Sequence, residues 1–141
     1  MKKLVVFTVL MSLMLTAFEW NSKSTDKGVD FKEVSFEQAL KLASESEKYV
    51  FMDAYASWCG PCKMMDRNTF SKSEVGEAFN EHFVSIKVDM EKGEGPTLAR
   101  KYHVRAYPTT FILNSKGEVQ KRIVGYRGPE EMLKELAEFI K

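Results

Sequence analysis

The chain has few of the residues that cross-link a fold or ligate a metal. Among its 141 residues there are two cysteines and two histidines, His82 and His103. A structural zinc site normally needs four Cys or His ligands in paired spacings, and the two histidines lie apart from each other and from the cysteines. We therefore expect no metal site, and we expect both histidines to be surface residues.

The chain also lacks an excess of charge of either sign. It has 21 basic and 20 acidic residues and a formal net charge of +1. Because phosphate backbones are bound by concentrated positive charge, this balance argues against nucleic-acid binding. An apolar fraction of 44% and a charged fraction of 29% fit one soluble domain large enough to bury its own core.

No apolar run reaches the length of about 20 residues that a comfortable membrane span needs. The N-terminus carries Lys2 and Lys3, followed by an apolar stretch from Leu4 to Phe18 that three hydroxyl residues interrupt. This layout is typical of a secretory signal. We expect residues 1–18 to be a signal peptide, with an uncleaved membrane anchor or a cytoplasmic apolar tail as alternatives. The polar residues 19–30 are expected to form a spacer.

Residues 31–141 alternate between helical and strand patterns. The apolar run 49–55, interrupted only by Asp53, suits a strand that is buried on both faces. Further strands are predicted at 84–89, 109–113 and 118–124, and the last two form a hairpin. Helices are predicted after Ser35, over 62–67, and from Ser73, Pro96 and Pro129. The apolar positions of the last helix continue up to Ile140. This order predicts an α/β layered domain with a central mixed sheet.

Both cysteines lie in the segment Trp58-Cys59-Gly60-Pro61-Cys62-Lys63. A structural disulfide here would close a very short loop and would stabilise the fold little, because stabilisation grows with loop length. The pair instead follows a predicted buried strand and opens a helix, where free N–H groups and the helix dipole lower the pKa of a thiol. Pro61 fits the first helical turn, and Gly60 removes bulk beside the first sulfur. We therefore expect Cys59 to be the exposed nucleophile and Cys62 the residue that resolves the mixed disulfide.

This segment resembles the active-site motif of thioredoxins letter for letter. Asp53 stands where thioredoxins keep a buried aspartate, Tyr107-Pro108-Thr109 resembles their cis-proline segment, and Gly125 corresponds to the glycine after their last strand. The resemblance covers residues 31–141. It implies the thioredoxin fold, a central mixed β-sheet flanked by helices, and a redox-active Cys59–Cys62 disulfide with no other cofactor.

The resemblance also implies roles for the residues around the sulfurs. Asp53 would take or give the proton of Cys62, although an acid facing water is the alternative. Lys87 matches a lysine near that aspartate, with a solvated lysine as the alternative.

Substrate would bind at Gly60 and Pro61 and at the backbone before Pro108, which offers a strand edge to an extended chain. Trp58 and Tyr107 would form apolar walls of the same groove, with ordinary packing as the alternative for Trp58.

Two departures from the thioredoxin pattern favour a specialised role. Arg67 replaces the proline that usually kinks the helix after the second cysteine, and residues 68–75 look more like the C-terminal domain of the membrane disulfide reductases called DsbD. Together with the leader, these departures favour a monomeric reductant of protein disulfides in the periplasm or another compartment outside the cytoplasm, with a tether to the membrane through the N-terminal segment as the alternative to a free protein. Its expected electron donor is a membrane protein of the DsbD type.

Three other functions stay open. The first alternative is an oxidase or isomerase of the same fold. The second is a Cu(I)-binding assembly chaperone that uses two soft thiolates, and the third is a binding module without chemistry. No Met-x-x-Met motif supports the copper alternative, and two intact cysteines argue against the last one.

Overall fold

A four-stranded mixed sheet forms the centre of the molecule. The computed structural model describes residues 27–141, so the expected signal at 1–18 and most of the expected spacer lie outside the described residues. The strands have the order β2-β1-β3-β4. β2 is parallel to β1, whereas β3 is antiparallel to both β1 and β4. The strands are β1 (Tyr49–Tyr55), β2 (Phe83–Asp89), β3 (Thr109–Leu113) and β4 (Val119–Val124).

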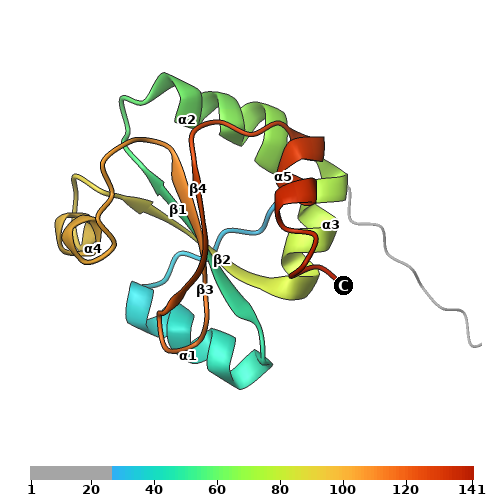
Figure 1. Ribbon diagram of the computed structural model, residues 1–141, viewed down its shortest axis with the longest axis horizontal. Coiled ribbons are helices and arrows are strands. Elements are labelled where there is room, and N and C mark those ends of the chain that lie inside the picture. Colours follow the sequence, from blue (N-terminus) through green and yellow to red (C-terminus); the bar gives the residue numbers. More distant parts are fainter. Residues whose placement is uncertain (1–26) are drawn as a thin grey trace, which may run out of the picture.

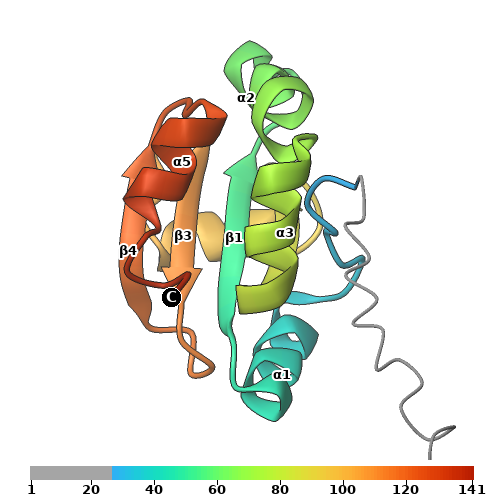
Figure 2. The same cartoon turned by 90° about the vertical axis from the view of Figure 1, so that its right-hand side faces the viewer.

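Helices cover both faces of this sheet, which is the predicted thioredoxin fold. The helical segments are α1 (Phe36–Ser46), α2 (Gly60–Met65), the π-helical segment η1 (Asp66–Phe70), α3 (Ser73–His82), α4 (Gly95–Lys101) and α5 (Pro129–Glu135). Figures 1 and 2 show α1 and α4 on one side of the strands and α3 and α5 on the other. None of the helices within residues 27–141 combines the length and the apolar character needed to cross a bilayer.

Alternation along β1 sends its side chains into two separate cores. Met52 and Ala54 pack with α1 and α4, whereas Phe51 packs with α3, η1 and α5. Since successive strand residues point to opposite faces, Asp53 shares the face of Phe51. The one acid of the strand therefore lies on the side of the sheet that carries α2.

Helix α1 begins directly after Ser35, as the sequence predicts. The Ser35 side chain accepts a hydrogen bond from the Gln38 amide at 3.2 Å, and the Gln38 side chain accepts one from the Ser35 amide at 3.0 Å. This reciprocal capping box satisfies two N–H groups that the first turn leaves free.

Two helices differ from the sequence predictions. α2 begins at Gly60 rather than at Cys62, because Cys59 itself acts as the N-cap and Pro61 occupies the first turn. α5 ends at Glu135 rather than near Ile140. After Glu135, backbone bonds tighten to three-residue steps, as in Ala137 N–H to the Lys134 carbonyl, while Phe139 and Ile140 still pack on the core. The apolar spacing of residues 132–140 therefore predicts which side chains are buried, but it does not predict where the helix ends.

The chain before α1 is packed against the domain. The Val29 amide donates to the Phe70 carbonyl at 2.7 Å, and the Asn80 side chain donates to the Gly28 carbonyl at 3.2 Å. Phe31 forms a parallel bridge to Ser85 of β2. We call residues 27–31 the N-terminal strap; residues 27–30 of it belong to the stretch expected to be a spacer.

Candidate active site

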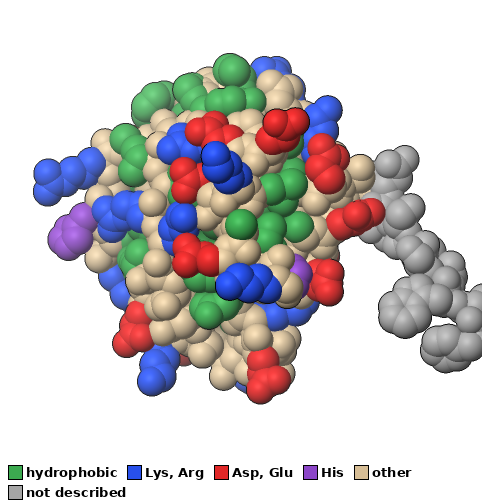
Figure 3. Space-filling model, turned by 45° about the vertical axis from the view of Figure 1, so that its right-hand side comes forward, with side chains coloured by type: hydrophobic (Ala, Val, Ile, Leu, Met, Phe, Trp, Pro, Cys, Tyr) green, Lys and Arg blue, Asp and Glu red, His purple; other side chains and the backbone are tan. Residues whose placement is uncertain are grey.

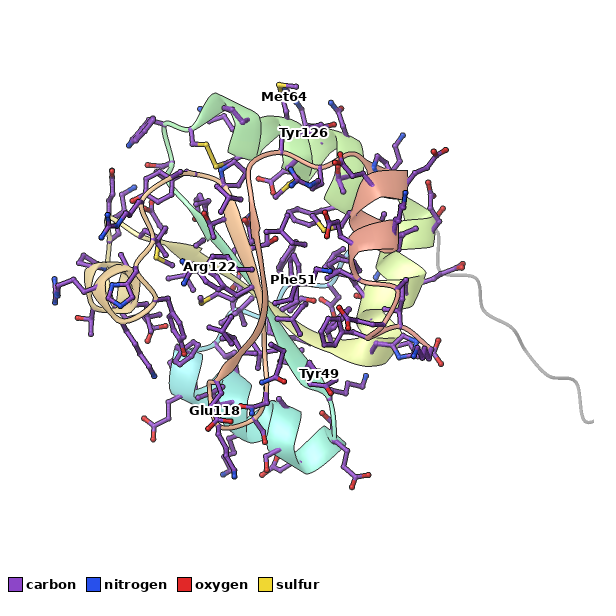
Figure 4. The ribbon with its side chains drawn as sticks, in the orientation of Figure 1. Tyr49, Phe51, Met64, Glu118, Arg122 and Tyr126 are labelled. Atoms are coloured by element: carbon purple, nitrogen blue, oxygen red, sulfur yellow. A yellow bond between two sulfur atoms is a disulfide. The ribbon has the colours of Figure 1, made fainter. Side chains whose placement is uncertain are left out.

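A disulfide joins Cys59 and Cys62 at the start of α2, with their Cα atoms 5.3 Å apart. In Figure 4 it is the sulfur–sulfur bond at the upper left, beside the first turn of α2. The sulfur of Cys59 accepts a hydrogen bond from the Cys62 amide at 3.2 Å. An amide aimed at this sulfur stabilises negative charge there, so the fold supports a thiolate at Cys59 once the disulfide is reduced.

Both sulfurs are covered in this disulfide form. Cys59 is 2% exposed and Cys62 is 1% exposed, and the side chains of Ala56, Tyr55 and Tyr107 pack against them. The expectation that Cys59 is an exposed sulfur is therefore wrong for the disulfide. The position of Cys59 at a helix start predicts the hydrogen bonds to its sulfur. It does not predict that Tyr107, from a distant loop, covers the sulfur.

Trp58 and Tyr107 lie beside the disulfide, at the surface that the resemblance predicts as a substrate groove. Trp58 is 66% exposed, its ring contacts the ring of Tyr107 edge-on at 5.9 Å, and its indole N–H donates to Glu91 at 2.9 Å. The Tyr107–Pro108 peptide bond is cis, and the Pro108 carbonyl accepts from the Gly125 amide at 2.8 Å. Gly60 and Pro61, which follow Cys59 directly, are exposed.

The pKa of Tyr107 is raised, first by partial burial and then by the carboxylates of Glu91 and Asp89. The phenol therefore stays neutral at physiological pH and acts in the groove as an apolar wall with a polar tip.

A second group of side chains consists of Lys87 and the two carboxylates that it contacts, Asp53 and Asp66. The ammonium of Lys87 lies 2.6 Å from Asp53 and 2.5 Å from Asp66. It also lies 4.8 Å from the centre of the Tyr55 ring, within the range of a cation–π contact. Asp53 and Lys87 face each other because β1 and β2 pair them directly in register. Asp66 reaches the same ammonium from the start of η1, one helical turn after Cys62.

Burial dominates the electrostatics of Asp53. The side chain is completely buried, which raises its pKa above the usual 3.8; Lys87 opposes this rise and Asp66 adds to it. Its Oδ1 atom has no hydrogen-bond partner among the described residues. For Lys87, burial lowers the pKa, but the two carboxylates outweigh burial and the pKa lies above 10.5. The pair thus combines a carboxyl poised to hold a proton with a permanently charged ammonium.

The fold brings the sequence-predicted residues into two groups. Cys59, Cys62, Trp58 and Tyr107 meet at the groove, and Asp53 and Lys87 meet below it. Sequence reasoning missed Asp66 and Glu91. Asp66 carried a usable signal, because four residues place it one helical turn from Cys62; Glu91 carried none. Within residues 27–141, no three His, Cys, Asp or Glu side chains cluster in a way that could hold a metal ion.

Comparison with known proteins shows that the chain is similar to thioredoxins. The sequence profile of a thioredoxin-like domain matches residues 36–140. Thioredoxin Y1, chloroplastic, of Arabidopsis thaliana is 32% identical over 120 residues, which cover 85% of this chain and 66% of that protein. The matches to two further curated thioredoxins span 50% and 53% of their lengths.

Two solved structures show the same fold with appreciable identity. A Bacteroides thetaiotaomicron protein named as a candidate disulphide-isomerase superposes with a TM-score of 0.72 at 46% identity, over 82% of this chain and 95% of that one. The reduced C-terminal domain of Neisseria meningitidis DsbD superposes with a TM-score of 0.61 at 27% identity, over 73% and 92% of the two chains.

Proposed function

This chain belongs to the thioredoxin-like family, and from that premise we propose that it is a thiol–disulfide oxidoreductase that reduces protein disulfides outside the cytoplasm. The observation that carries the proposal is the Cys59–Cys62 disulfide at the N-terminus of α2, with an amide directed at the Cys59 sulfur. A stabilising structural bridge would close a longer loop. The Cys59–Cys62 bridge closes a very short loop and lies at a helix N-terminus, where a thiolate is stabilised.

The reaction follows from the positions of the groups. The Cys59 thiolate attacks one sulfur of the substrate disulfide, so the substrate S–S bond breaks and the first substrate thiolate leaves and takes a proton from water. Asp53 accepts the proton of the Cys62 thiol. The Cys62 thiolate then attacks the Cys59 sulfur, the mixed disulfide breaks, and the second substrate thiolate leaves and takes the proton that Asp53 received from Cys62. The substrate gains two electrons and two protons, and the protein ends as the Cys59–Cys62 disulfide.

Lys87 and the groove residues support these steps. The Lys87 ammonium stabilises the Asp53 carboxylate before it takes the proton, since the two groups lie 2.6 Å apart. An extended substrate lies along Trp58, Tyr107 and the backbone before Pro108, where main-chain hydrogen bonds hold its cysteine near Cys59.

The reducing direction is supported by two features. The dipeptide between the cysteines is Gly60-Pro61 and contains no histidine, which would add stabilisation to the thiolate and favour an oxidant. The similarity to the DsbD C-terminal domain points the same way. The basic and apolar leader at 1–18 supports export. In an oxidising compartment such a reductant needs a membrane electron donor, and we assign that role to a DsbD-type protein.

The second candidate is an isomerase or oxidase on the same site. The observation that favours it is the 46% identity to the Bacteroides thetaiotaomicron protein, which is named as a candidate disulphide-isomerase. Both candidates use the same two sulfurs and differ in how strongly the dithiol form is favoured.

The reduction potential of the Cys59–Cys62 pair separates these candidates. Equilibration with glutathione or dithiothreitol buffers, followed by mass spectrometry of the alkylated protein, gives this potential. A reductant is expected near the thioredoxin value of about −270 mV, whereas values near about −180 or about −120 mV are those of an isomerase or a strong oxidant. A value in the higher range would overturn the reducing direction, and a Cys59→Ser variant that still reduces disulfides would overturn the site.

A further inference from the structure

One segment of the chain is free of acidic residues although the whole chain is balanced. Between Gly95 and Gly117 there is no Asp or Glu, while Arg100, Lys101 and Arg105 fall within this stretch. Elsewhere many cations are neutralised by neighbours: Lys32, Lys41, Lys87, Lys92, Lys121 and Arg127 all form ion pairs. Within residues 27–141, no ion pair involves Arg100, Lys101 or Arg105.

The tertiary structure brings Arg122 and Lys101 to the same residue, Tyr102. Arg122 of β4 donates to the Tyr102 carbonyl at 2.6 Å, and Lys101 lies 5.2 Å from the centre of the Tyr102 ring. Figure 4 shows Arg122 on the α4 side of β4, opposite the side of Phe51. The turn after α4 folds back, since the Val104 amide donates to the Ala99 carbonyl at 2.9 Å. We call Arg100, Lys101, Arg105 and Arg122 the basic rim.

The basic rim adjoins the predicted substrate groove. Arg105 is exposed and lies two residues before Tyr107, whose ring packs on the disulfide cysteines and contacts Trp58. Val124, which follows Arg122 on the same face of β4, is 51% exposed and pairs with Thr109, next to Pro108. In Figure 3, the Lys and Arg side chains at the left edge of the molecule lie beside a histidine. The basic rim therefore begins next to the residues that surround the disulfide.

Helix stability accounts for only part of the basic rim. Arg100 and Lys101 occupy the last turn of α4, where cations complement the helix dipole. Arg105 lies beyond the helix and Arg122 on a strand, so the dipole explains neither.

Acidic residues also lie beside Trp58 and Tyr107. Glu91 accepts the hydrogen bond from Trp58, and both Glu91 and Asp89 raise the pKa of Tyr107. Acidic residues of a bound chain are therefore attracted by Arg105 and repelled by Glu91.

We propose that the basic rim docks protein partners that carry acidic residues next to the disulfide they present to Cys59. This inference rests on the proposed function for its choice of partner. A protein is favoured over a lipid surface because the rim is continuous with the groove that holds the reacting disulfide. Charges placed beside a reactive site increase the association rate of a complementary partner by about tenfold or more at low ionic strength.

Three disulfide peptides with one common core test this surface. Their flanking residues are glutamate, glutamine or lysine, and kcat/KM for their reduction is measured at about 0.01 M salt, where the Debye length is about 30 Å, and at about 0.15 M. The test variant is Arg100→Gln/Lys101→Gln/Arg105→Gln. The matched control, Lys41→Gln/Lys72→Gln/Lys134→Gln, loses the same formal charge from exposed positions in α1, directly before α3 and in α5.

The wild type is expected to prefer the glutamate peptide over the lysine peptide by about tenfold at low salt, and less at higher salt. The test variant should lower this preference to less than about twofold, while the control retains most of it. Equal rates for the three peptides, or an equal loss in both variants, would overturn the proposal. So would rim-dependent sedimentation with phosphatidylglycerol vesicles without any peptide preference, since the rim would then be a membrane contact.

Failure of the proposed function gives a different result. If none of the three peptides is reduced, the oxidoreductase assignment fails, and the rim is then judged by calorimetric binding of the oxidised protein to cysteine-free versions of the same peptides. Tighter binding of the glutamate version, lost in the test variant alone, still supports the surface. Equal binding of all versions rejects it.

Discussion

At the residue scale, the two cysteines differ in their bonding although both are buried. Cys59 caps α2 and its sulfur accepts a hydrogen bond from an amide, whereas Cys62 lies one turn inside the helix. Only Cys59 has the environment that favours a thiolate, so attack and resolution are expected from different sulfurs.

The Cys62→Ser variant should therefore accumulate mixed disulfides through Cys59, because no second thiol remains to release the substrate. Non-reducing mass spectrometry after incubation with a disulfide peptide measures this adduct. The matched Cys59→Ser variant should form little of it. Equal adduct in both variants, or preferential labelling of Cys62 when the reduced wild type is briefly treated with iodoacetamide, would contradict the assignment of the nucleophile.

Asp53 shows a second residue-scale effect, a carboxyl whose pKa burial raises above 3.8. The folded state thus holds its proton more tightly than the unfolded state, and this group lowers the free energy of unfolding as pH rises from about 4 toward the raised pKa. Asp53→Asn should remove that loss. We expect the oxidised variant to be more stable than the wild type by about 1–3 kcal/mol at about pH 8, with a smaller difference at about pH 4.

Urea unfolding at both pH values measures this difference, and Asp66→Asn is the control because Asp66 contacts the same ammonium but its side chain is 44% exposed. Disulfide reduction should slow in Asp53→Asn, since the acceptor of the Cys62 proton is lost. A stability change independent of pH, together with unaltered reduction kinetics, would show that the carboxyl neither titrates in folding nor takes part in exchange.

At the scale of elements, the N-terminal strap is held to α3 by close backbone contact. A Cβ atom added to Gly76 would lie 2.2 Å from the Lys27 carbonyl oxygen, so no side chain fits there. The strap carries Phe31, whose ring centre lies 5.1 Å from the Lys87 ammonium. Packing of the strap therefore forms part of the surroundings of the Asp53–Lys87 pair.

Gly76→Ala should displace the strap and cost about 1–3 kcal/mol of stability through overpacking. Amide exchange at Val29, which donates to Phe70 at 2.7 Å, measures the displacement directly and should become faster. Gly60→Ala is the control, because its added Cβ meets no atom within 4 Å. Unchanged exchange at Val29 in Gly76→Ala would mean that the strap tolerates the methyl group in place.

At the scale of the whole molecule, the proposed compartment sets the redox state of the cysteines. The disulfide of a reductant in an oxidising compartment must be reduced again after each turnover by a membrane donor, since cytosolic dithiols do not reach it. The state of Cys59 and Cys62 in cells therefore reports both location and direction.

We expect the pair to be mostly thiols in cells that contain the membrane electron carrier and a disulfide in cells that lack it. Acid quenching followed by a mass-shifting thiol reagent distinguishes the two forms. A pair that stays oxidised in normal cells would indicate an oxidant. A pair that stays reduced without the carrier would indicate that the protein is not exported.

The sequence alone was sufficient for features that depend on neighbouring residues. The start of α1 after Ser35, the buried strand β1, the hairpin and the Cys59–Cys62 motif all follow from short spacings, because local hydrogen bonds and side-chain periodicity determine them. The length of α5 did not follow, since its apolar positions continue to pack after its helical bonds end.

Only the tertiary structure determined which distant groups meet. Strand pairing brings Lys87 to Asp53, as the resemblance to thioredoxins implied. No short spacing predicts that Lys87 also reaches Asp66, that Tyr107 covers the sulfurs from a remote loop, or that Glu91 binds Trp58 across 33 positions. The burial that raises the pKa of Asp53 and the closeness of Arg122 to Lys101 likewise arise from packing between elements. Such contacts depend on how layers stack and on which strands pair, and neither is encoded in the spacing of any single segment.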